Sequence, residues 1–313
     1  MDFIDVTIRE SVYLKHGMNE QKALIYLDKY KELMPFEEVK YLELCFLDNH
    51  QKGTLLYDPD FIRAAYEKVK GRYGLTAVLH PGLVDLERWD PEVIRCFSSI
   101  RFMINGKMDE HCEAVIDYIH ALGVAVSINV IYISRKDRDF VLDCLRVARR
   151  HNVEVFTFAD SCGSCMPEEV TKQLGFVKDY DPAFKRNFHF HNHFNLALTN
   201  ALACSDLVDL MDASVHGYGK GGGNLNLEQV LFSGRVRSGR LVPAEAVVRY
   251  AELLKFLVGD IFEEDWRQAL EEYKNLLIGY YNLNLKDVDE LEEQSGGDAI
   301  CFCACAAEKG IRK

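Results

Sequence analysis

Residues 124–158 (VAVSINVIYISRKDRDFVLDCLRVARRHNVEVFTF) contain two apolar runs separated by an amphipathic stretch. The runs Val124–Ile131 and Val153–Phe158 are rich in β-branched and aromatic residues, which is typical of strands buried on both faces. Between them, Phe140–Arg150 carries apolar side chains at helical spacing. The stretch therefore predicts a strand–helix–strand unit with parallel strands.

The same alternation recurs along most of the chain. Six further strands are predicted, at Phe3–Ile8, Val39–Phe46, Leu75–Leu79, Ile100–Ile104, Arg186–Phe190 and Leu207–Val215. Helical patterns start at Glu20 and cover residues 113–122, where Gly123 is a typical C-cap. About eight units, with starts roughly 20–40 residues apart, predict an α/β fold of the closed (β/α)8 TIM-barrel type. An open doubly wound sheet is the alternative, although such a sheet usually has fewer strands.

The alternation stops near Pro243, which suits the first turn of a helix. Two helices are predicted beyond it, at Ala244–Leu257 and Glu263–Leu277, and the last 25 residues are acidic, then Gly-rich, then Cys-containing. We therefore expect a catalytic barrel over residues 1–242, a helical extension over 243–288 and a conditionally ordered tail over 289–313. The extension is expected to pack on the barrel or to form a subunit interface, and a homo-oligomer is the expected state.

Composition excludes several classes of partner. The chain has 313 residues, with 37 basic and 49 acidic ones, for a net charge of −12. Nucleic acids and anionic membranes are therefore not expected partners, because no cationic excess is present to displace counterions. The first residues carry charges that interrupt any signal region, and no run reaches the roughly 18 apolar residues of a membrane span. The ten cysteines are spread from Cys45 to Cys305, which favours reduced thiols in a soluble cytoplasmic protein.

Polar residues follow the predicted strands at the end where a barrel places its active site. They are Arg9 and Glu10, His80, Asp160 and Ser161, His189 and His191, and a glycine-rich turn over residues 217–224. Side chains two apart on a strand share a face, so His189 and His191 can reach one divalent cation. With Glu10 they form a two-histidine, one-carboxylate set that leaves positions open for substrate. The structural alternatives are a surface salt bridge for Glu10 and satisfied core histidines.

Four segments together resemble the DRE-type TIM-barrel metallolyases. That group includes 4-hydroxy-2-oxovalerate aldolases, hydroxymethylglutaryl-CoA lyase, and the isopropylmalate and homocitrate synthases. DVTIRES (5–11) is similar to the opening Asp-x-Thr-Leu-Arg-Asp-Gly motif, and ADSCGS (159–164) to the Ala-Asp-Ser/Thr-x-Gly turn. HFHNHFNLALTN (189–200) resembles the His-x-His-Asn-Asp strand, and DASVHGYGKGGGN (212–224) resembles the closing Gly/Asn loop.

The resemblance implies a function and a set of site residues. The metal ligands fall on Glu10, His189 and His191, with Asn224 as a fourth ligand or a supporting group, and the catalytic arginine falls on Arg9. The implied enzyme is a divalent-metal-dependent aldolase-type carbon–carbon lyase, with Mn²⁺ or Mg²⁺ as the expected cofactor and Zn²⁺ as the alternative. Its small-molecule partner is a 2-oxo acid or a 4-hydroxy-2-oxo acid adduct. Metal and guanidinium would stabilise the enolate charge that develops when the carbon–carbon bond breaks.

The chain departs from the family pattern at several positions. Glu10 replaces Asp, Ser11 replaces Gly, His193 replaces Asp, and Tyr13 stands where aldolases carry His. A phenol with an ordinary pKa near 10 is a poor general base at neutral pH. Either Tyr13 acts as an acid or hydrogen-bond donor, or a histidine elsewhere in the chain carries out the proton transfer. The histidines open to that role are His193, His216 and His80.

Other functions stay open on the same residues. A Claisen-type synthase or acyl-CoA lyase is the first alternative, and the loop with Lys220 suits an acyl-CoA or phosphate group. A catalytically degenerate barrel that serves as a binding partner is the second alternative. The Gly217-x-Gly219-x-x-Gly222 pattern is not interpreted as dinucleotide-binding, because it follows the last strand and no acidic residue lies about 20 positions later. Cys301, Cys303 and Cys305 lack a fourth ligand for a zinc site, so an ordinary tail is expected there.

Overall fold

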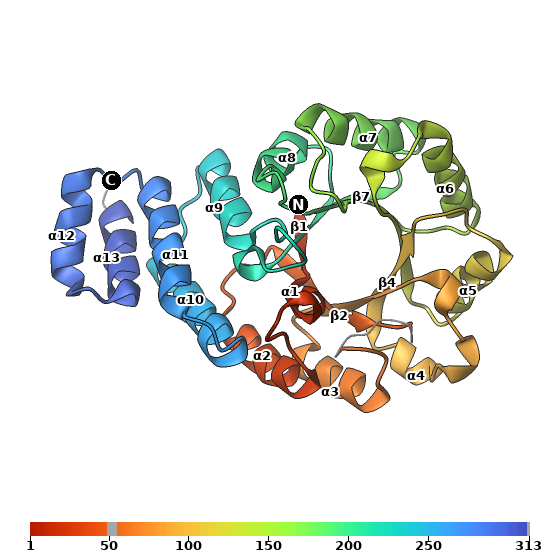
Figure 1. Ribbon diagram of the computed structural model, residues 1–313, viewed down its shortest axis with the longest axis horizontal. Coiled ribbons are helices and arrows are strands. Elements are labelled where there is room, and N and C mark those ends of the chain that lie inside the picture. The colour runs from red at the N-terminus through yellow and green to blue at the C-terminus, as the bar shows by residue number, and fades with distance from the viewer. Residues whose placement is uncertain (49–54, 312–313) are drawn as a thin grey trace. The chain divides into compact units, whose positions relative to one another are not determined.

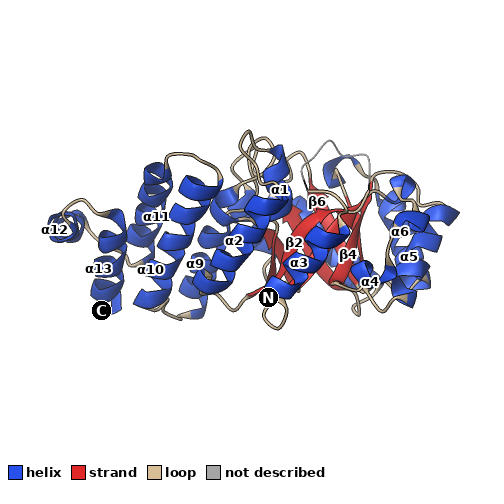
Figure 2. Ribbon diagram, turned by 90° about the horizontal axis from the view of Figure 1, so that it is seen from below, coloured by secondary structure: helices blue, strands red, loops and turns tan. Residues whose placement is uncertain are grey.

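Eight parallel strands close into a barrel in the order of the chain, with β1 pairing both β2 and β8 (Figures 1 and 2). The computed structural model describes residues 1–48 and 55–311. The strands are β1 (Asp2–Asp5), β2 (Val39–Phe46), β3 (Gly74–Leu79), β4 (Phe97–Ile104), β5 (Ala125–Val130), β6 (Val155–Asp160), β7 (Lys185–Phe190) and β8 (Leu210–Ala213). The predicted (β/α)8 barrel is confirmed.

Helices alternate with these strands. They are α1 (Thr7–Glu10), α2 (Glu20–Leu33), α3 (Pro59–Val69), α4 (Pro91–Ile94), α5 (Glu110–Ala121), α6 (Arg138–Arg150), α7 (Pro167–Tyr180) and α8 (Ala197–Cys204). Helix α6 shows why they form where they do. The Asp137 side chain accepts a hydrogen bond from Phe140 N at 2.8 Å, which caps the helix start. Val141, Leu145 and Ala148 follow at helical spacing and are buried.

The first strand ends earlier than predicted, and this shapes the site. Phe3–Ile8 was expected to be extended, but β1 ends at Asp5 and the chain enters α1 at Thr7. The Asp5 carboxylate causes this local turn by accepting hydrogen bonds from Thr7 N at 2.8 Å and Thr7 Oγ1 at 2.5 Å. Arg9 and Glu10 therefore lie on a short helix at the carboxyl end of β1. The last predicted strand, Leu207–Val215, is likewise shorter, because β8 covers only 210–213.

Helices alone make up the remainder of the chain. The described residues divide into two compact units, the first covering 1–24 and 38–226 and the second 25–37 and 227–313. The second unit contains α9 (Leu227–Ser238), α10 (Ala244–Lys255), the π-helical turn η6 (Phe256–Ile261), α11 (Trp266–Tyr280), α12 (Leu285–Ser295) and α13 (Ala299–Ile311). Residues 227–242, predicted as the end of the barrel, thus group with the helical unit. Within the described ranges, no helix is both long enough and apolar enough to cross a bilayer.

The expected tail is folded. Residues 289–311 contribute to two helices, α12 and α13, and α13 contacts α10, α11 and α12. The physical reason lies in the spacing of small and apolar residues: Phe302, Cys303, Ala306 and Ala307 are fully buried and lie on one face of α13. Asn284 caps α12, and Gly296 ends it in a left-handed conformation with φ 58°. The segment expected to be a conditionally ordered tail is instead helical over residues 299–311, and of its three cysteines Cys303 lies on the buried face.

Candidate active site

Five of the predicted site residues line one cavity at the carboxyl ends of the strands. This cavity of about 80 Å³ receives side chains from α1, β7 and the β8 loop as well as from neighbouring strand ends. Its lining comprises Arg9, Glu10, Tyr13, Val78, Met103, Asn129, Ile131, Tyr132, Ala159, Ser161, His189, His191 and Lys220. The carboxyl end of a barrel is where this fold places its catalytic groups.

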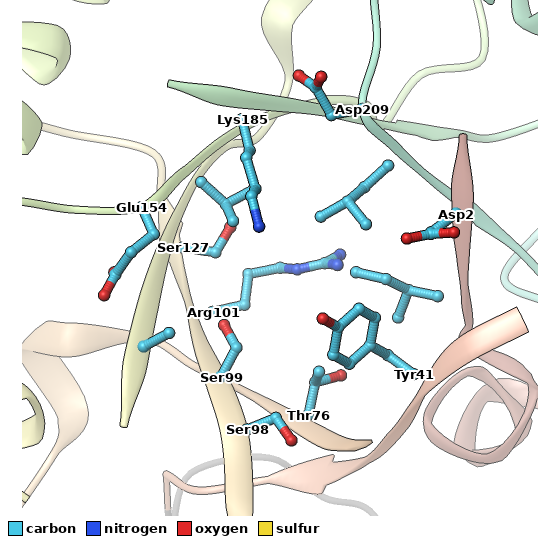
Figure 3. Close-up of a pocket in the computed structure, with 14 residues that line it drawn as sticks. Asp2, Tyr41, Thr76, Ser98, Ser99, Arg101, Ser127, Glu154, Lys185 and Asp209 are labelled. Carbon is cyan, nitrogen blue, oxygen red and sulfur yellow. The ribbon is translucent and has the colours of Figure 1, made fainter. Parts of the chain in front are cut away.

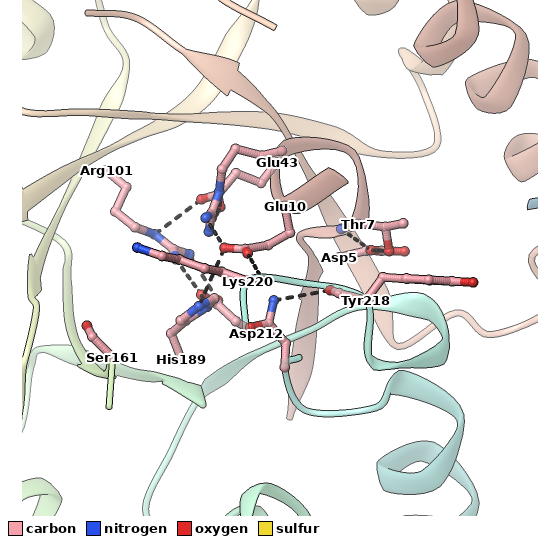
Figure 4. Close-up of polar contacts among 12 residues, drawn as sticks. Asp5, Thr7, Glu10, Glu43, Arg101, Ser161, His189, Asp212, Tyr218 and Lys220 are labelled. Atoms are coloured by element: carbon pink, nitrogen blue, oxygen red, sulfur yellow. Dashed lines mark hydrogen bonds and ion pairs between the residues drawn. The ribbon is translucent and has the colours of Figure 1, made fainter. Parts of the chain in front are cut away.

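Glu10 and Arg9 form a buried ion pair at the edge of the cavity (Figure 4). Arg9 also donates from Nε to Glu43 Oε1 at 2.7 Å, and the backbone N–H of Lys220 donates to Glu10 Oε2 at 3.2 Å. Burial raises the pKa of Glu10, but the Arg9 charge, the two histidines and the Lys220 N–H together outweigh burial, so the pKa of Glu10 lies below its ordinary value. Glu10 is therefore a carboxylate at neutral pH, which is the form that binds a cation.

His189 has a fixed orientation. Its Nδ1 lies 2.9 Å from Asp212 Oδ2, and Asp212 also accepts from Arg101 Nη2 at 2.9 Å and Asn187 Nδ2 at 2.8 Å. Burial raises the pKa of Asp212, but Arg101 and the His189 hydrogen bond reverse this and hold the pKa well below its ordinary value. An ionised carboxylate only accepts hydrogen bonds, so Nδ1 of His189 carries the proton and Nε2 presents a lone pair.

Of the side-chain polar atoms that are buried without partners in the described part of the chain, two belong to residues that lie next to each other. They are His191 Nδ1 and Asn224 Oδ1, and the backbones of His191 and Asn224 pair with each other. Burial and the adjacent His189 lower the pKa of His191 to about 3, so the ring is neutral at physiological pH. A buried acceptor without a partner is costly unless a ligand or an ion satisfies it. Both atoms therefore suit a cation.

The spacing of the proposed ligands is close to that of a metal site. His189 Nε2 lies 3.8 Å from Glu10 Oε1, and the His189 and His191 ring centroids are 5.0 Å apart. Two donors at metal-bond distance from one ion are separated by about 3–4 Å, depending on the bond angle. No three His, Cys, Asp or Glu side chains among residues 1–48 and 55–311 are already gathered at ligand spacing. Carboxylate and imidazole donors at this spacing fit a divalent cation.

Tyr13 lies at the mouth of the cavity, on the 3₁₀ turn η1 (Ser11–Tyr13) that follows α1. Burial raises its pKa above 10, an effect only partly offset by Arg9. The phenol is therefore protonated at neutral pH, which agrees with a hydrogen-bond donor or acid and not with a general base. The Lys220 ammonium lies 5.5 Å from the centre of the Tyr13 ring.

The histidines considered as alternative bases lie away from this lining. His193 is packed between two loops: a Cβ at Gly221 would meet its Nε2 at 2.5 Å, and a Cβ at Gly163 would meet its Nδ1 at 2.8 Å. His216 has a left-handed backbone, φ 57°, and its ring centre lies 5.4 Å from that of Tyr218, with the two rings tilted at 56°. His80 Nδ1 lies 2.9 Å from the buried Asp48. In the part of the chain that the structure describes, the cavity lining includes neither these three histidines nor Asn224.

Sequence reasoning missed the charged layer beneath the cavity. Glu43 on β2, Arg101 on β4 and Asp212 on β8 are buried, and they link Arg9 to His189 through successive ion pairs. Asn129, which lines the cavity with a buried and unpartnered Oδ1, was also missed. The signal was present in the sequence, because a charged residue inside an otherwise apolar strand run must face a polar partner within the barrel.

A second cavity lies at the opposite end of the barrel (Figure 3). It is larger, about 260 Å³, and is lined by residues at or near the beginnings of strands, including Asp2, Thr76, Ser127 and Lys185. The amino end of a (β/α)8 barrel contributes to stability, whereas the chemistry takes place at the carboxyl end. The smaller cavity with the histidines is therefore the candidate active site despite its size.

Comparisons with known proteins agree with this fold. Residues 100–252 match the HMGL-like family model. The 4-hydroxy-2-oxovalerate aldolase of Thermus thermophilus is 24% identical over 309 residues, covering 96% of this chain and 86% of the relative. A 2-isopropylmalate synthase from Bacillus thuringiensis is 27% identical over 187 residues, covering 56% of this chain and only 34% of that protein. The N-terminal domain of a candidate aldolase from Bacteroides vulgatus superposes with a TM-score of 0.69 and 22% identity, covering 93% of this chain and 97% of that one.

The fold is a (β/α)8 barrel, and these relatives, named as aldolases and synthases, support an enzyme of the carbon–carbon lyase class. Within that class, the predicted resemblance to the DRE-type TIM-barrel metallolyases is confirmed, with the HMGL-like match covering the second half of the barrel and the start of the helical unit.

Proposed function

We propose that the chain is a divalent-metal-dependent aldolase-type lyase that cleaves or forms a carbon–carbon bond next to the ketone of a 2-oxo acid. The observation that carries this proposal is the meeting of Arg9, Glu10, His189 and His191 around one cavity. The aldolase relative aligned along most of its length supports this choice of substrate class. A 2-oxo acid or its 4-hydroxy-2-oxo acid adduct is the proposed small-molecule partner, and a cytoplasmic homo-oligomer remains the predicted form of the enzyme.

The metal would be held by Glu10, His189 and His191, with Asn224 beside them. Carboxylate oxygen and imidazole nitrogen suit Mn²⁺ and Mg²⁺, and they also suit Zn²⁺. When bound, the cation supplies a Lewis acid for the ketone oxygen. Asp212 supports the site by fixing the proton on His189 Nδ1, and this leaves Nε2 free as a ligand.

Arg9 and Tyr13 act on the substrate itself in this proposal. Arg9 is held in place by Glu43, so its guanidinium offers fixed donors to the carboxylate and to the negative charge that develops on the adjacent oxygen. Tyr13 stays protonated and can donate a hydrogen bond to the hydroxyl or aldehyde oxygen of the substrate. Asn129 offers a further polar group at the cavity wall.

The test is release of pyruvate or 2-oxobutyrate from 4-hydroxy-2-oxo acids in the presence of Mn²⁺ or Mg²⁺. We expect turnover that depends on the added metal and that falls by at least about 100-fold in Arg9→Met, because one oxyanion donor contributes that much to kcat. Absence of turnover on every such substrate, with metal shown to be bound, would reject the aldolase assignment.

A Claisen-type synthase or acyl-CoA lyase is the second candidate, supported by the isopropylmalate synthase relative. Thiol release from acetyl-CoA with a panel of 2-oxo acids separates the two activities. A barrel that binds neither metal nor substrate would instead act as a binding partner, and metal analysis of the purified protein tests that outcome.

A further inference from the structure

Lys220 is the single charged residue in the glycine-rich run over residues 217–223. The glycines on either side of Lys220 are closely packed against other residues. A Cβ atom added at Gly219 would lie 2.5 Å from Asn224 Nδ2, and one added at Gly221 would lie 2.5 Å from His193 Nε2. The backbone N–H of Lys220 is tied to Glu10 Oε2 at 3.2 Å. The loop therefore holds one lysine at the mouth of the active site, and Figure 4 shows its side chain extending across the cluster of Glu10, His189 and Arg101.

The described carboxylates near the cavity form ion pairs with arginine side chains and none with the Lys220 ammonium. Arg9 pairs with Glu10 and Glu43, and Arg101 pairs with Asp212 and Glu43. The Lys220 ammonium lies over the Tyr13 ring, 5.5 Å from its centre. Among the described residues, no carboxylate lies within ion-pair distance of this ammonium. A cation that faces a ligand cavity without an acidic partner favours an anionic ligand group.

We propose that Lys220 binds a second carboxylate on the substrate, so that the preferred substrate is a 2-oxo dicarboxylic acid or its hydroxy adduct. This inference rests on the proposed function, in which the metal and Arg9 take the 2-oxo acid end. The apolar side chains of Val78, Met103 and Ile131 line the same cavity and suit the carbon chain between the two ends. A single ammonium in a cavity of about 80 Å³ suits a carboxylate better than a phosphate, which usually gathers several donors.

The experiment compares acids that differ only in the second carboxylate. Calorimetry with Mn²⁺-loaded protein measures binding of 2-oxoglutarate against 2-oxovalerate, and of 2-oxoadipate against 2-oxohexanoate. The wild-type protein should bind at least one diacid about tenfold more tightly than its monoacid partner, since a charge-assisted contact contributes about 1.5 kcal/mol or more. That preference should disappear in Lys220→Met and return in Lys220→Arg.

Lys172→Met is the matched control, because Lys172 is an exposed lysine of the same unit that lies on α7 outside the active-site lining. It removes the same charge and should leave the diacid preference as in the wild type. Equal binding of both members of each pair by the wild type, or a preference that survives in Lys220→Met, would overturn this inference alone. Failure of the Mn²⁺-loaded protein to bind any of the four acids would also contradict the proposed function.

Discussion

Asp212→Asn probes the charged layer under the active site with a minimal change of shape. In the wild type, Asp212 accepts hydrogen bonds from Arg101, Asn187 and His189, and it is 1% exposed. The substitution removes one buried charge and leaves Arg101 with Glu43, whose Oε2 lies 3.5 Å from Arg101 Nε. Removing one partner of a buried ion pair costs about 3–5 kcal/mol, and the remaining Glu43 contact places the expected loss near the lower limit, about 3 kcal/mol.

The same substitution should weaken metal binding. An asparagine amide can donate as well as accept, so the proton on His189 Nδ1 is no longer enforced and Nε2 is less often available as a ligand. Loss of a carboxylate that orients a ligand histidine lowers metal affinity by about 10- to 100-fold. Stability and Mn²⁺ affinity should therefore fall together.

Urea unfolding of the metal-free protein and Mn²⁺ calorimetry measure the two effects separately. Asp209→Asn is the matched control, because Asp209 precedes the same strand, pairs with Arg186 and is 43% exposed. It should change the free energy of unfolding by less than about 1 kcal/mol and leave Mn²⁺ affinity as in the wild type. The reasoning would be refuted if Asp212→Asn resembled this control in both measurements.

Three further outcomes follow from other parts of the molecule. Phe302→Ala should destabilise the protein by about 3–5 kcal/mol in urea unfolding, because Phe302 is fully buried in α13; a loss below about 1 kcal/mol would mean that residues 299–311 do not pack. Hydrogen bonds to Asp117 and Glu113 outweigh burial and raise the pKa of His151 in the folded protein. Protonated His151 therefore stabilises the fold fully below about pH 6.5, the ordinary histidine pKa, and this stabilisation is lost as the pH rises through the raised pKa of the folded state. His151→Gln should remove that part of the stability–pH profile, a change on the order of 0.5 kcal/mol, and an unchanged profile would contradict the assignment. Treatment with a chelator should abolish lyase turnover and added Mn²⁺ should restore it, whereas turnover that persists after metal analysis reads zero would argue against a metal enzyme.

The barrel could be predicted from sequence because its strands are buried on both faces. Such strands appear as short apolar runs between helical patterns, and the stretch over residues 124–158 shows this plainly. The boundaries were less predictable: the Asp5 side chain ends β1 early by hydrogen bonding to Thr7, a local competition that periodicity does not reveal. The helix α13 was missed because its run of small residues and cysteines resembles a low-complexity tail.

The site residues that could be predicted lie close together in sequence or at a strand end. His189 lies at the end of β7 and His191 follows that strand, and Arg9 and Glu10 follow β1, so all four could be named before the structure. The layer formed by Glu43, Arg101 and Asp212 depends on contacts between strands far apart in sequence, up to 111 residues for Arg101 and Asp212. Which residues meet at that separation depends on how the strands align when the barrel closes. A single sequence does not reveal that alignment.

Anomalous scattering from crystals grown with Mn²⁺ tests most directly whether Glu10 and the two histidines of β7 bind one ion. The expected result is a single peak in the cavity that contacts a Glu10 oxygen and one ring nitrogen each from His189 and His191, and that is lost in Glu10→Gln. A peak that contacts none of these side chains, or no peak at a Mn²⁺ concentration that supports turnover, would contradict the account.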